Sequence, residues 1–433
     1  MRLTTASISL VLLAAFSAGA ALDEDWVELA AGDLCWAEMA RFGDDLYVVW
    51  VDWTTERLMF LRRDPGGASA PLAISSGADF PSYPQVYAHE RDVHVAWVED
   101  GTLSMRTSRD RGATFGSPVL VSGPLPGGPA AITWSGGRLH VAWTWSEEDE
   151  IGGVAVAVSP NRGASFLPPL RLDDGAGHGD VRIAAHGNGV HVLWDDSWRN
   201  DDPRARIRSS RDHGKSYGPL TILSPYASDW PTVFVGSVHA HANRVFVHWE
   251  QMDWIFGGAR WRTHFFARSL DRGQSFGTSI LATGGYLQIG PGRLAASHHH
   301  LAFAWEAHDS DDLFSPSELF LRESFDGGST FGPAVDLSQS PGTWSQLLGL
   351  DVDGRRTHVV WREAMTTPGG SQWFRGVTVE DGVPGPSVDL MEDTIDVEVV
   401  AFSAVDGHLD ILALQWTPSV YRLLHRHGRG TLH

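Results

Sequence analysis

The chain has 433 residues, of which 33 are basic and 53 are acidic, so its formal net charge is −20. A surface this acidic argues against nucleic acid and against anionic membranes as partners. Cys35 is the single cysteine, so no intramolecular disulfide can form, but 19 Trp and 19 Phe residues can build a core by burying aromatic surface.

The first 21 residues have the pattern of a secretory signal peptide. Met1 and Arg2 open the chain, an apolar run covers residues 8–16, and small residues follow at 18–21. The apolar run is too short to cross a bilayer, and no later run is long enough to do so. We expect an exported protein, extracellular or periplasmic, in which residues 22–433 form a single domain. The alternative interpretation is a buried N-terminal helix.

Eight short segments rich in Val, Leu and Ala end in Trp. They cover residues 46–50, 93–97, 139–143, 190–194, 245–249, 301–305, 357–361 and 412–416. Their composition and the turns around them predict β-strands. Each follows a turn containing Gly, Asn or Asp and, before that turn, another apolar run, so the two runs are expected to pair as a hairpin. A variable, often acidic loop and a third strand come after each Trp.

An octapeptide of the form Ser-x-Asp/Asn-x-Gly-x-Ser/Thr-aromatic follows the third strand in five of these units. It occurs at residues 108–115, 159–166, 210–217, 269–276 and 324–331, with starts 51, 51, 59 and 55 residues apart. Units of about 50 residues with four strands predict an all-β fold, a β-propeller of four-stranded antiparallel blades. The Trp segments favour eight blades. Seven is the alternative, if the last unit is only a C-terminal cap.

The last unit lacks a fourth strand, because the chain ends soon after its third apolar run at residues 419–424. Residues 25–30 form an orphan strand pattern near the N-terminus that matches the fourth strands of the other units. We therefore predict that this N-terminal strand completes the last blade and closes the ring, which removes two exposed sheet edges.

The octapeptide contains residues that can stabilise the turn of a β-hairpin. Asp110 can accept hydrogen bonds from backbone N–H groups of its own turn, Gly112 permits a backbone angle closed to other residues, and Phe115 can plug into the blade. The equivalent residues of the other copies are Asn161, Asp212, Asp271 and Asp326. None of these roles requires a substrate.

Ser-x-Asp-x-Gly-x-Thr-Phe is the Asp box, and the chain resembles the Asp-box (BNR-repeat) β-propellers of the sialidase superfamily. For a sialidase, the resemblance implies an early Arg-Ile-Pro segment, three arginines that grip the substrate carboxylate, a Tyr–Glu pair and an Asp acid. The sequence has no Arg-Ile-Pro; the nearest string, Val-Arg-Ile-Ala, contains Arg182. Arg41, Arg182 and Arg293 are the arginines whose convergence would support the triad.

Carboxylates are frequent in the loops between the second and third strands, on the face opposite the Asp boxes. They include Asp52, Glu99, Asp195, Asp196, Glu250, Glu306 and Glu363. Carboxylates that converge could bind Ca²⁺ or act as the acid and base of a glycosidase, although solvated loop charge is the plainer interpretation.

Tryptophans occur in the same loops, and a Trp beside Asp and Arg suits a sugar ring. The candidate ligand-binding residues are Trp198, Arg199, Asp201, Asp202, Glu250, Asp253, Trp254, Trp261 and Arg182. We predict an exported, monomeric, non-catalytic module that binds a glycan or an extracellular protein. No cofactor is predicted, with bound Ca²⁺ as the alternative. The alternative is a glycoside hydrolase of the exo-sialidase type.

The histidines indicate blade packing rather than chemistry. His94, His140, His191 and His358 all precede a blade Trp by three residues, and a position repeated in this way is expected to serve the blade. The run at residues 298–300 could join His239 and His241 in a transition-metal site, but successive residues of a strand point to opposite sides. No metal site is therefore predicted.

Overall fold

The computed structural model describes residues 26–145, 152–173, 179–196, 203–224, 231–254, 260–277, 280–281, 288–308, 316–365, 371–392, 397–405, 407–417 and 420–429. The predicted signal peptide lies outside these residues. Every helix or strand among the described residues is a β-strand, and none of them belongs to a helix that could cross a membrane. The predicted all-β class is confirmed.

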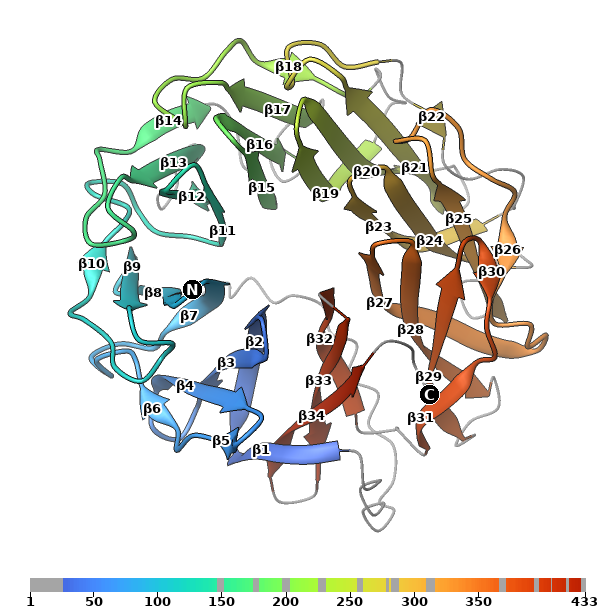
Figure 1. Ribbon diagram of the computed structural model, residues 1–433, viewed down its shortest axis with the longest axis horizontal. Helices are drawn as coiled ribbons and strands as arrows, with labels where there is room; N and C mark the ends of the chain where they lie inside the picture. The colour runs from blue at the N-terminus through green and yellow to red at the C-terminus, as the bar shows by residue number, and fades with distance from the viewer. Residues whose placement is uncertain are drawn as a thin grey trace.

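The strands form antiparallel sheets that stand around a ring like the blades of a propeller (Figure 1). The first strand of each unit is innermost. These first strands are β2 (Leu34–Phe42), β7 (Ser82–His89), β11 (Ala130–Ser135), β15 (Val181–His186), β19 (Pro231–His241), β23 (Gln288–Ser297), β27 (Thr343–Asp353) and β32 (Val397–Val405). The second strands are β3 (Asp45–Asp52), β8 (Asp92–Glu99), β12 (Arg138–Trp145), β16 (Gly189–Asp195), β20 (Arg244–Trp254), β24 (His300–His308), β28 (Arg356–Met365) and β33 (His408–Trp416).

The third strands pair with the second strands, and short outer strands complete the sheets. The third strands are β4 (Arg57–Asp64), β9 (Thr102–Ser108), β13 (Gly153–Ser159), β17 (Ala205–Ser210), β21 (Arg260–Ser269), β25 (Ser317–Ser324), β29 (Gln372–Glu380) and β34 (Tyr421–Arg429). The outer strands are β5 (Gly67–Ala68), β6 (Leu72–Ala73), β10 (Val119–Leu120), β14 (Leu170–Asp173), β18 (Thr221–Ile222), β22 (Ile280–Leu281), β26 (Val335–Asp336), β30 (Val383–Pro384) and β31 (Val388–Glu392).

The two ends of the described chain meet in one sheet. Strand β1 (Trp26–Gly32) pairs antiparallel with β34, and the sheet order is β1-β34-β33-β32. The indole Nε1 of Trp26 donates to the carbonyl oxygen of Leu390 at 3.0 Å, which ties β1 to the preceding unit as well. Each first strand also contacts the first strand of the next unit, and β32 contacts β2.

The blade tryptophans form the cores between neighbouring sheets. Trp97, Trp143, Trp194, Trp249, Trp305 and Trp361 are among the largest fully buried side chains, and Trp50 is buried as well. Trp416 is 43% exposed, and the prediction that it is the eighth blade tryptophan is wrong. The turn at Val405 and His408 sets the register of β33, so the position equivalent to the other tryptophans is Ala413.

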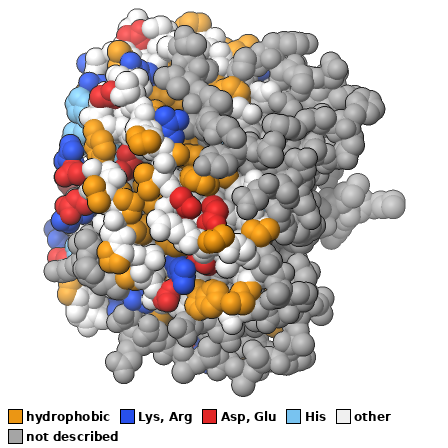
Figure 2. All heavy atoms as spheres, turned by 90° about the vertical axis from the view of Figure 1, so that its right-hand side faces the viewer, with side chains coloured by type: hydrophobic (Ala, Val, Ile, Leu, Met, Phe, Trp, Pro, Cys, Tyr) orange, Lys and Arg blue, Asp and Glu red, His pale blue; other side chains and the backbone are white. Residues whose placement is uncertain are grey.

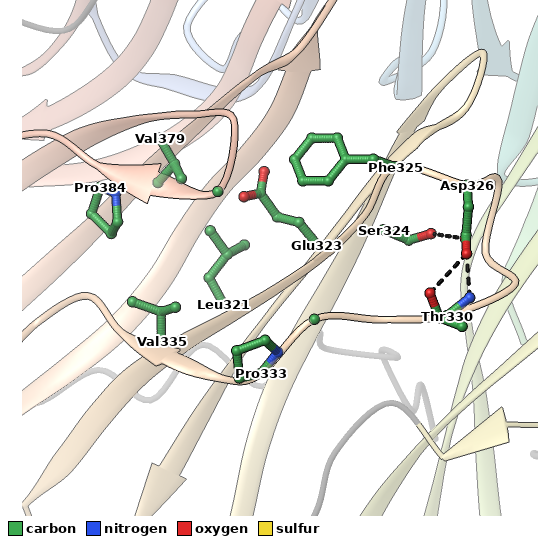
Figure 3. A pocket seen from close by; sticks show the side chains of 12 residues that line it. Leu321, Glu323, Ser324, Phe325, Asp326, Thr330, Pro333, Val335, Val379 and Pro384 are labelled. Atoms are coloured by element: carbon green, nitrogen blue, oxygen red, sulfur yellow. Dashed lines mark hydrogen bonds between the residues drawn. The ribbon is translucent and has the colours of Figure 1, made fainter.

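The Asp boxes staple the hairpins that follow the third strands. Asp110 accepts hydrogen bonds from the Ser108 hydroxyl at 2.7 Å, the Thr114 backbone N–H at 2.9 Å and the Thr114 hydroxyl at 2.6 Å. These bonds lower the pKa of Asp110 to about 2. Asp326 is held in the same way by Ser324 and Thr330 (Figure 3).

Each Asp box also packs against neighbouring parts of the ring. Gly112 has φ +81°, and a Cβ there would lie 2.5 Å from Cζ of Phe60 in the preceding unit, so only glycine fits. The Arg111 backbone N–H donates to the carbonyl oxygen of Arg91, which lies in the turn between the first and second strands. The Asp boxes and these turns therefore share one face of the ring, called here the Asp-box face.

The repeated histidines are packing residues in the structure. Nδ1 of His94 lies 3.0 Å from the Thr107 hydroxyl, and Nδ1 of His191 lies 2.9 Å from the Ser209 hydroxyl, in each case on the neighbouring third strand. Burial lowers the pKa of both imidazoles to about 4, so they are neutral at ordinary pH. A glycine of the next Asp box packs on each ring, Gly163 on His94 and Gly273 on His191.

Candidate functional site

Most of the predicted ligand-binding residues cannot be placed. Trp198, Arg199, Asp201 and Asp202 lie outside the described residues. Asp253 and Trp254 fall at the end of β20, and Trp261 falls in β21, but their side chains are not among those described. Arg182 and Glu250 are described, and both lie near the middle of the ring.

Three of the predicted face carboxylates tie one unit to the next. Oδ2 of Asp195 accepts from the Val235 N–H at 3.2 Å, Oε1 of Glu250 from the Gly292 N–H at 3.3 Å, and Oε1 of Glu306 from the Leu347 N–H at 2.9 Å. Each of these N–H groups lies at a β-bulge of a first strand, where regular pairing is interrupted. Part of the acidity of this face is therefore structural.

Charged side chains from several units gather toward the axis of the ring. We call them the polar centre, and its members are Glu38, Arg182, Glu250, Arg262, Arg293, Glu306 and Arg362. Burial raises the pKa of Glu38 to about 7, and the positive charge of Arg182 acts in the opposite direction. The strands that carry these two residues, β2 and β15, are three units apart in sequence and face each other across the middle of the ring (Figure 1).

Arg293 lies among charges of both signs at the polar centre. Its side chain reaches solvent, but the surrounding protein and then the charge of Arg182 lower its pKa, while the charges of Glu250 and Glu306 act in the opposite direction. Among the described residues the guanidinium of Arg293 forms no hydrogen bond or ion pair. Arg182 is held by the carbonyl oxygens of Gly236 and Val181 and by Asp180. The two guanidinium groups repel each other, an arrangement that an anion between them would relieve.

The arginine triad considered from the sequence is not assembled. Arg41 forms an ion pair with Asp410 and lies 3.5 Å from Nδ1 of His427, close to the turn at Gly43 on the Asp-box face. Arg182 and Arg293 influence each other at the polar centre. Arg41 does not join them, because β2 ends at the opposite face from the start of β15, so the three arginines do not converge.

Two buried histidines beside the polar centre were missed by sequence reasoning. His248 of β20 and His264 of β21 are at most 1% exposed. Nε2 of His248 lies 3.1 Å from Nδ1 of His264, and Nε2 of His264 lies 2.9 Å from the Gly290 carbonyl oxygen. Nδ1 of His264 is 3.7 Å from Oε1 of Glu250. The sequence signal was available: His248 directly precedes the blade Trp249, where the other units have mostly Ala or Val.

The histidines considered from the sequence for a metal site do not gather around one point, although His241 and His298 pack together. His239 bonds to the Leu294 carbonyl oxygen, His299 to Arg244, and His300 to Glu323 at 2.8 Å. His241 packs against His298, with ring centroids 4.0 Å apart. In the described part of the chain, this run supplies no ligand group.

An exposed aromatic cluster lies where β2 and β7 begin, on the face opposite the Asp boxes. We call it the aromatic platform; Trp36 is 47% exposed, Trp53 50% and Tyr83 44%, and Phe80 is partly buried among them. The rings of Trp36 and Tyr83 are stacked with centroids 6.1 Å apart, and Phe80 contacts both tryptophans. Trp36 and Tyr83 have positive φ angles of 45° and 51° at the bulges of their strands. No local pattern of residues indicates this cluster, because its members come from two different units.

Two hollows among the described residues lie on the Asp-box face, and no residue of the polar centre lines either of them. One, of about 430 Å³, lies beside the Asp box of β25 and is lined by Leu321, Phe325 and Pro384 among others (Figure 3). The other, of about 650 Å³, lies around Asp45, Arg62 and Arg111. On the flank shown in Figure 2, acidic and basic side chains are mixed with apolar ones.

No family model matches the chain, and no curated protein is significantly similar to it. Among solved structures, it is similar to an ulvan lyase of polysaccharide lyase family PL25 bound to -[GlcA(1-4)Rha3S]-, with a TM-score of 0.51 and 10% identity over 82% of this chain and 96% of that one. Polysaccharide lyase Uly1 gives a TM-score of 0.50 and 8% identity over 79% and 89% of the two chains. Trypanosoma rangeli sialidase in complex with sialic acid gives only 0.37, with 14% identity over 72% and 55%. The two lyase structures show the fold, an all-β propeller of four-stranded antiparallel sheets.

Proposed function

We propose that the protein is an exported, eight-bladed β-propeller, closed by its N-terminal strand, that binds an acidic carbohydrate at the polar centre. The blade count is supported by the eight first strands, each in contact with the next around the ring. Closure is supported by the pairing of β1 with β34. The single domain over residues 22–433 and the signal peptide over residues 1–21 belong to the same proposal.

The observation that carries the proposal is the pair of mutually repelling arginines, Arg182 and Arg293, in a chain of net charge −20. Guanidinium groups bind carboxylate and sulfate oxygens through charge-assisted, often bidentate hydrogen bonds. An anion between the two groups would give Arg293 the partner that it lacks among the described residues. Saccharides with uronic acid or sulfate groups have this chemistry, and the ligand of the similar ulvan lyase is one of them.

The aromatic platform supplies the apolar surface that such a saccharide needs. Trp36 lies on β2 two residues before Glu38, so the platform and the polar centre are connected along one strand. Exposed indole faces stack on the C–H faces of pyranose rings while the hydroxyl groups remain in water. A chain of several sugars would stack at Trp36 and place an acidic sugar at Arg293.

Catalysis is a second candidate, favoured by two carboxyl groups with raised pKa values. Burial raises the pKa of Glu306 to about 8 and that of Glu38 to about 7, so both can carry a proton at neutral pH. A carboxylic acid with a raised pKa is the general acid of a glycoside hydrolase. The exo-sialidase type is less favoured, because Arg41 is bound to Asp410.

The proposal is tested by calorimetry or an array with acidic oligosaccharides and neutral ones of equal length. We expect binding of the acidic set and a loss of affinity of about tenfold or more in Arg293→Gln and Arg182→Gln. Arg356→Gln is the matched control, since it removes the same charge from an exposed ion pair with Glu380. Equal binding of both sets, or unchanged binding in both centre variants, would contradict the proposal.

Turnover separates binding from catalysis. The release of new reducing ends from the bound oligosaccharide is measured with the wild type and with Glu306→Gln. Release that disappears in Glu306→Gln while binding persists would establish the hydrolase. Binding without release would establish a binding module.

A further inference from the structure

We propose that His248, His264 and Glu250 form a site for one divalent transition-metal ion, with Zn²⁺ as the ion that best suits the ligands. The three side chains come from β20 and β21, which pair with each other, and Glu250 lies directly opposite His264 in the register. Two imidazoles and one carboxylate are a ligand set that Zn²⁺ uses in proteins. This proposal does not depend on the ligand of the polar centre.

The distances between the ligand atoms fit a tetrahedral ion. Nε2 of His248 and Nδ1 of His264 are 3.1 Å apart, and Nδ1 of His264 and Oε1 of Glu250 are 3.7 Å apart. Metal–ligand bonds of about 2.0–2.1 Å in a tetrahedron place neighbouring ligand atoms about 3.4 Å apart. The two distances lie on either side of this value, and all three ligand atoms lie within 4.8 Å of one another, so side-chain movements would bring them to one ion.

The surroundings fix His264 in the form that a metal needs. Its Nε2 lies 2.9 Å from the Gly290 carbonyl oxygen, which accepts only from an N–H, so Nδ1 carries the lone pair and points toward His248. Metal-binding histidines are commonly oriented by a carbonyl oxygen in this way. Glu250 is oriented by the Gly292 N–H and lies 3.4 Å from Arg262. Without metal, Nε2–H of His248 donates to Nδ1 of His264, and binding replaces this hydrogen bond.

Three protein ligands leave a fourth position for water or a ligand oxygen. Glu250 belongs to the polar centre, since its charge acts on Arg293 and Glu306. An ion held by Glu250 would therefore add positive charge at the edge of the polar centre.

A second group of similar residues shows what distinguishes the proposed site. Asp410, His425 and His427 also lie close together, but Asp410 accepts hydrogen bonds from both histidines and from Arg41. The Arg41 guanidinium donates to both oxygens of Asp410, so a metal ion would have to displace it, whereas Arg262 contacts Oε2 of Glu250 at 3.4 Å and Oε1 is the atom near His264. We expect one metal ion per chain from the two groups together.

The test is metal binding by the purified, full-length protein after removal of bound metal with a chelator. Titration with Zn²⁺ against a chromophoric chelator should give one site per chain, and Co²⁺ should give the intense visible absorption of tetrahedral coordination. His264→Gln is expected to weaken Zn²⁺ binding roughly 100-fold and Glu250→Gln roughly tenfold or more. The matched control His427→Gln should bind as the wild type does.

Circular dichroism of each variant shows whether it is folded. The Co²⁺ spectrum of the wild type tests the site without any substitution. A folded wild type that binds no Zn²⁺ and gives no tetrahedral Co²⁺ spectrum would overturn the proposal. Binding that is unchanged in both His264→Gln and Glu250→Gln would do the same, because the ion would then lie elsewhere.

Discussion

Carboxylates on the Asp-box face and carboxylates at the polar centre are surrounded by different numbers of hydrogen-bond donors. Asp110 accepts three hydrogen bonds from residues within four positions of it, and its pKa falls to about 2. Glu306 is buried and accepts one hydrogen bond from the Leu347 N–H of the next unit, and its pKa rises to about 8. The Asp-box carboxylate stabilises its own turn, whereas the central carboxylate is held in an environment that disfavours its charge.

This difference indicates where function is to be sought. A group whose pKa is strongly raised by burial, close to charged side chains, is typical of a binding or catalytic site. The carboxylates of the Asp boxes already accept hydrogen bonds from their own turns, so few acceptor positions are left for a ligand.

The largest effect on stability is expected at Asp410, which lies on the Asp-box side but is bound by residues distant in sequence. Its side chain is fully buried and binds Arg41, which is 5% exposed. Asp410→Ala would leave that guanidinium buried and unpaired, and we expect the free energy of unfolding to fall by about 3–5 kcal/mol. Urea unfolding measures the loss.

The double variant Asp410→Ala with Arg41→Leu is the control for this effect. Removing both charges should recover part of the loss, since no unpaired guanidinium remains. A loss below about 1 kcal/mol in the single variant would show that the ion pair between the two ends of the chain contributes little.

Glu306 tests the polar centre through the pH dependence of stability. The pKa of Glu306 in the folded protein, about 8, exceeds the ordinary value of 4.5. The favourable contribution of Glu306 to the free energy of unfolding is therefore fully present below pH 4.5 and is lost as the pH rises toward 8. Glu306→Gln cannot ionise, so its stability relative to the wild type should rise by about 1–3 kcal/mol between pH 5 and pH 8. A stability difference between Glu306→Gln and the wild type that is the same at both pH values would contradict the raised pKa.

The Asp box of β9 tests the opposite case. Asp110→Ala removes the acceptor of three hydrogen bonds and should lower the free energy of unfolding by about 1–2 kcal/mol. Because the folded pKa is depressed from 3.8 to about 2, this contribution is present above pH 4 and is lost as the pH falls toward 2.

Asn161 provides the comparison within the molecule. It fills the same position with an uncharged amide whose Oδ1 accepts from the Ser165 N–H and whose Nδ2 donates to the Ser165 hydroxyl. Asp110→Asn should therefore cost less than Asp110→Ala. If the two variants were equally unstable, the charge of Asp110 would matter more than the hydrogen-bond geometry.

Arg356 should show the smallest effect. Its ion pair with Glu380 is exposed, with 39% and 60% of the two side chains accessible. We expect Arg356→Gln to change the free energy of unfolding by less than about 0.5 kcal/mol. A larger loss would show that exposed pairs contribute to the Asp-box face, and the variant would no longer be a neutral control for ligand binding.

The sequence predicted the parts of the molecule that depend on neighbouring residues. Apolar runs, turns and Asp boxes follow from local hydrogen bonding and side-chain alternation, so the strands and the hairpins between them could be placed. Even there, Trp416 was misassigned as a blade tryptophan, because the register of β33 is set by its own turn and not by the spacing of tryptophans.

The tertiary structure alone decided where the polar centre, the aromatic platform and the buried histidine pair lie. Arg182 and Glu38 are 144 positions apart and meet only because the ring brings their first strands around one axis. Trp36 and Tyr83 stack because bulges turn both side chains outward at adjacent strands. Such contacts depend on the curvature of the whole ring, which no local pattern of residues encodes.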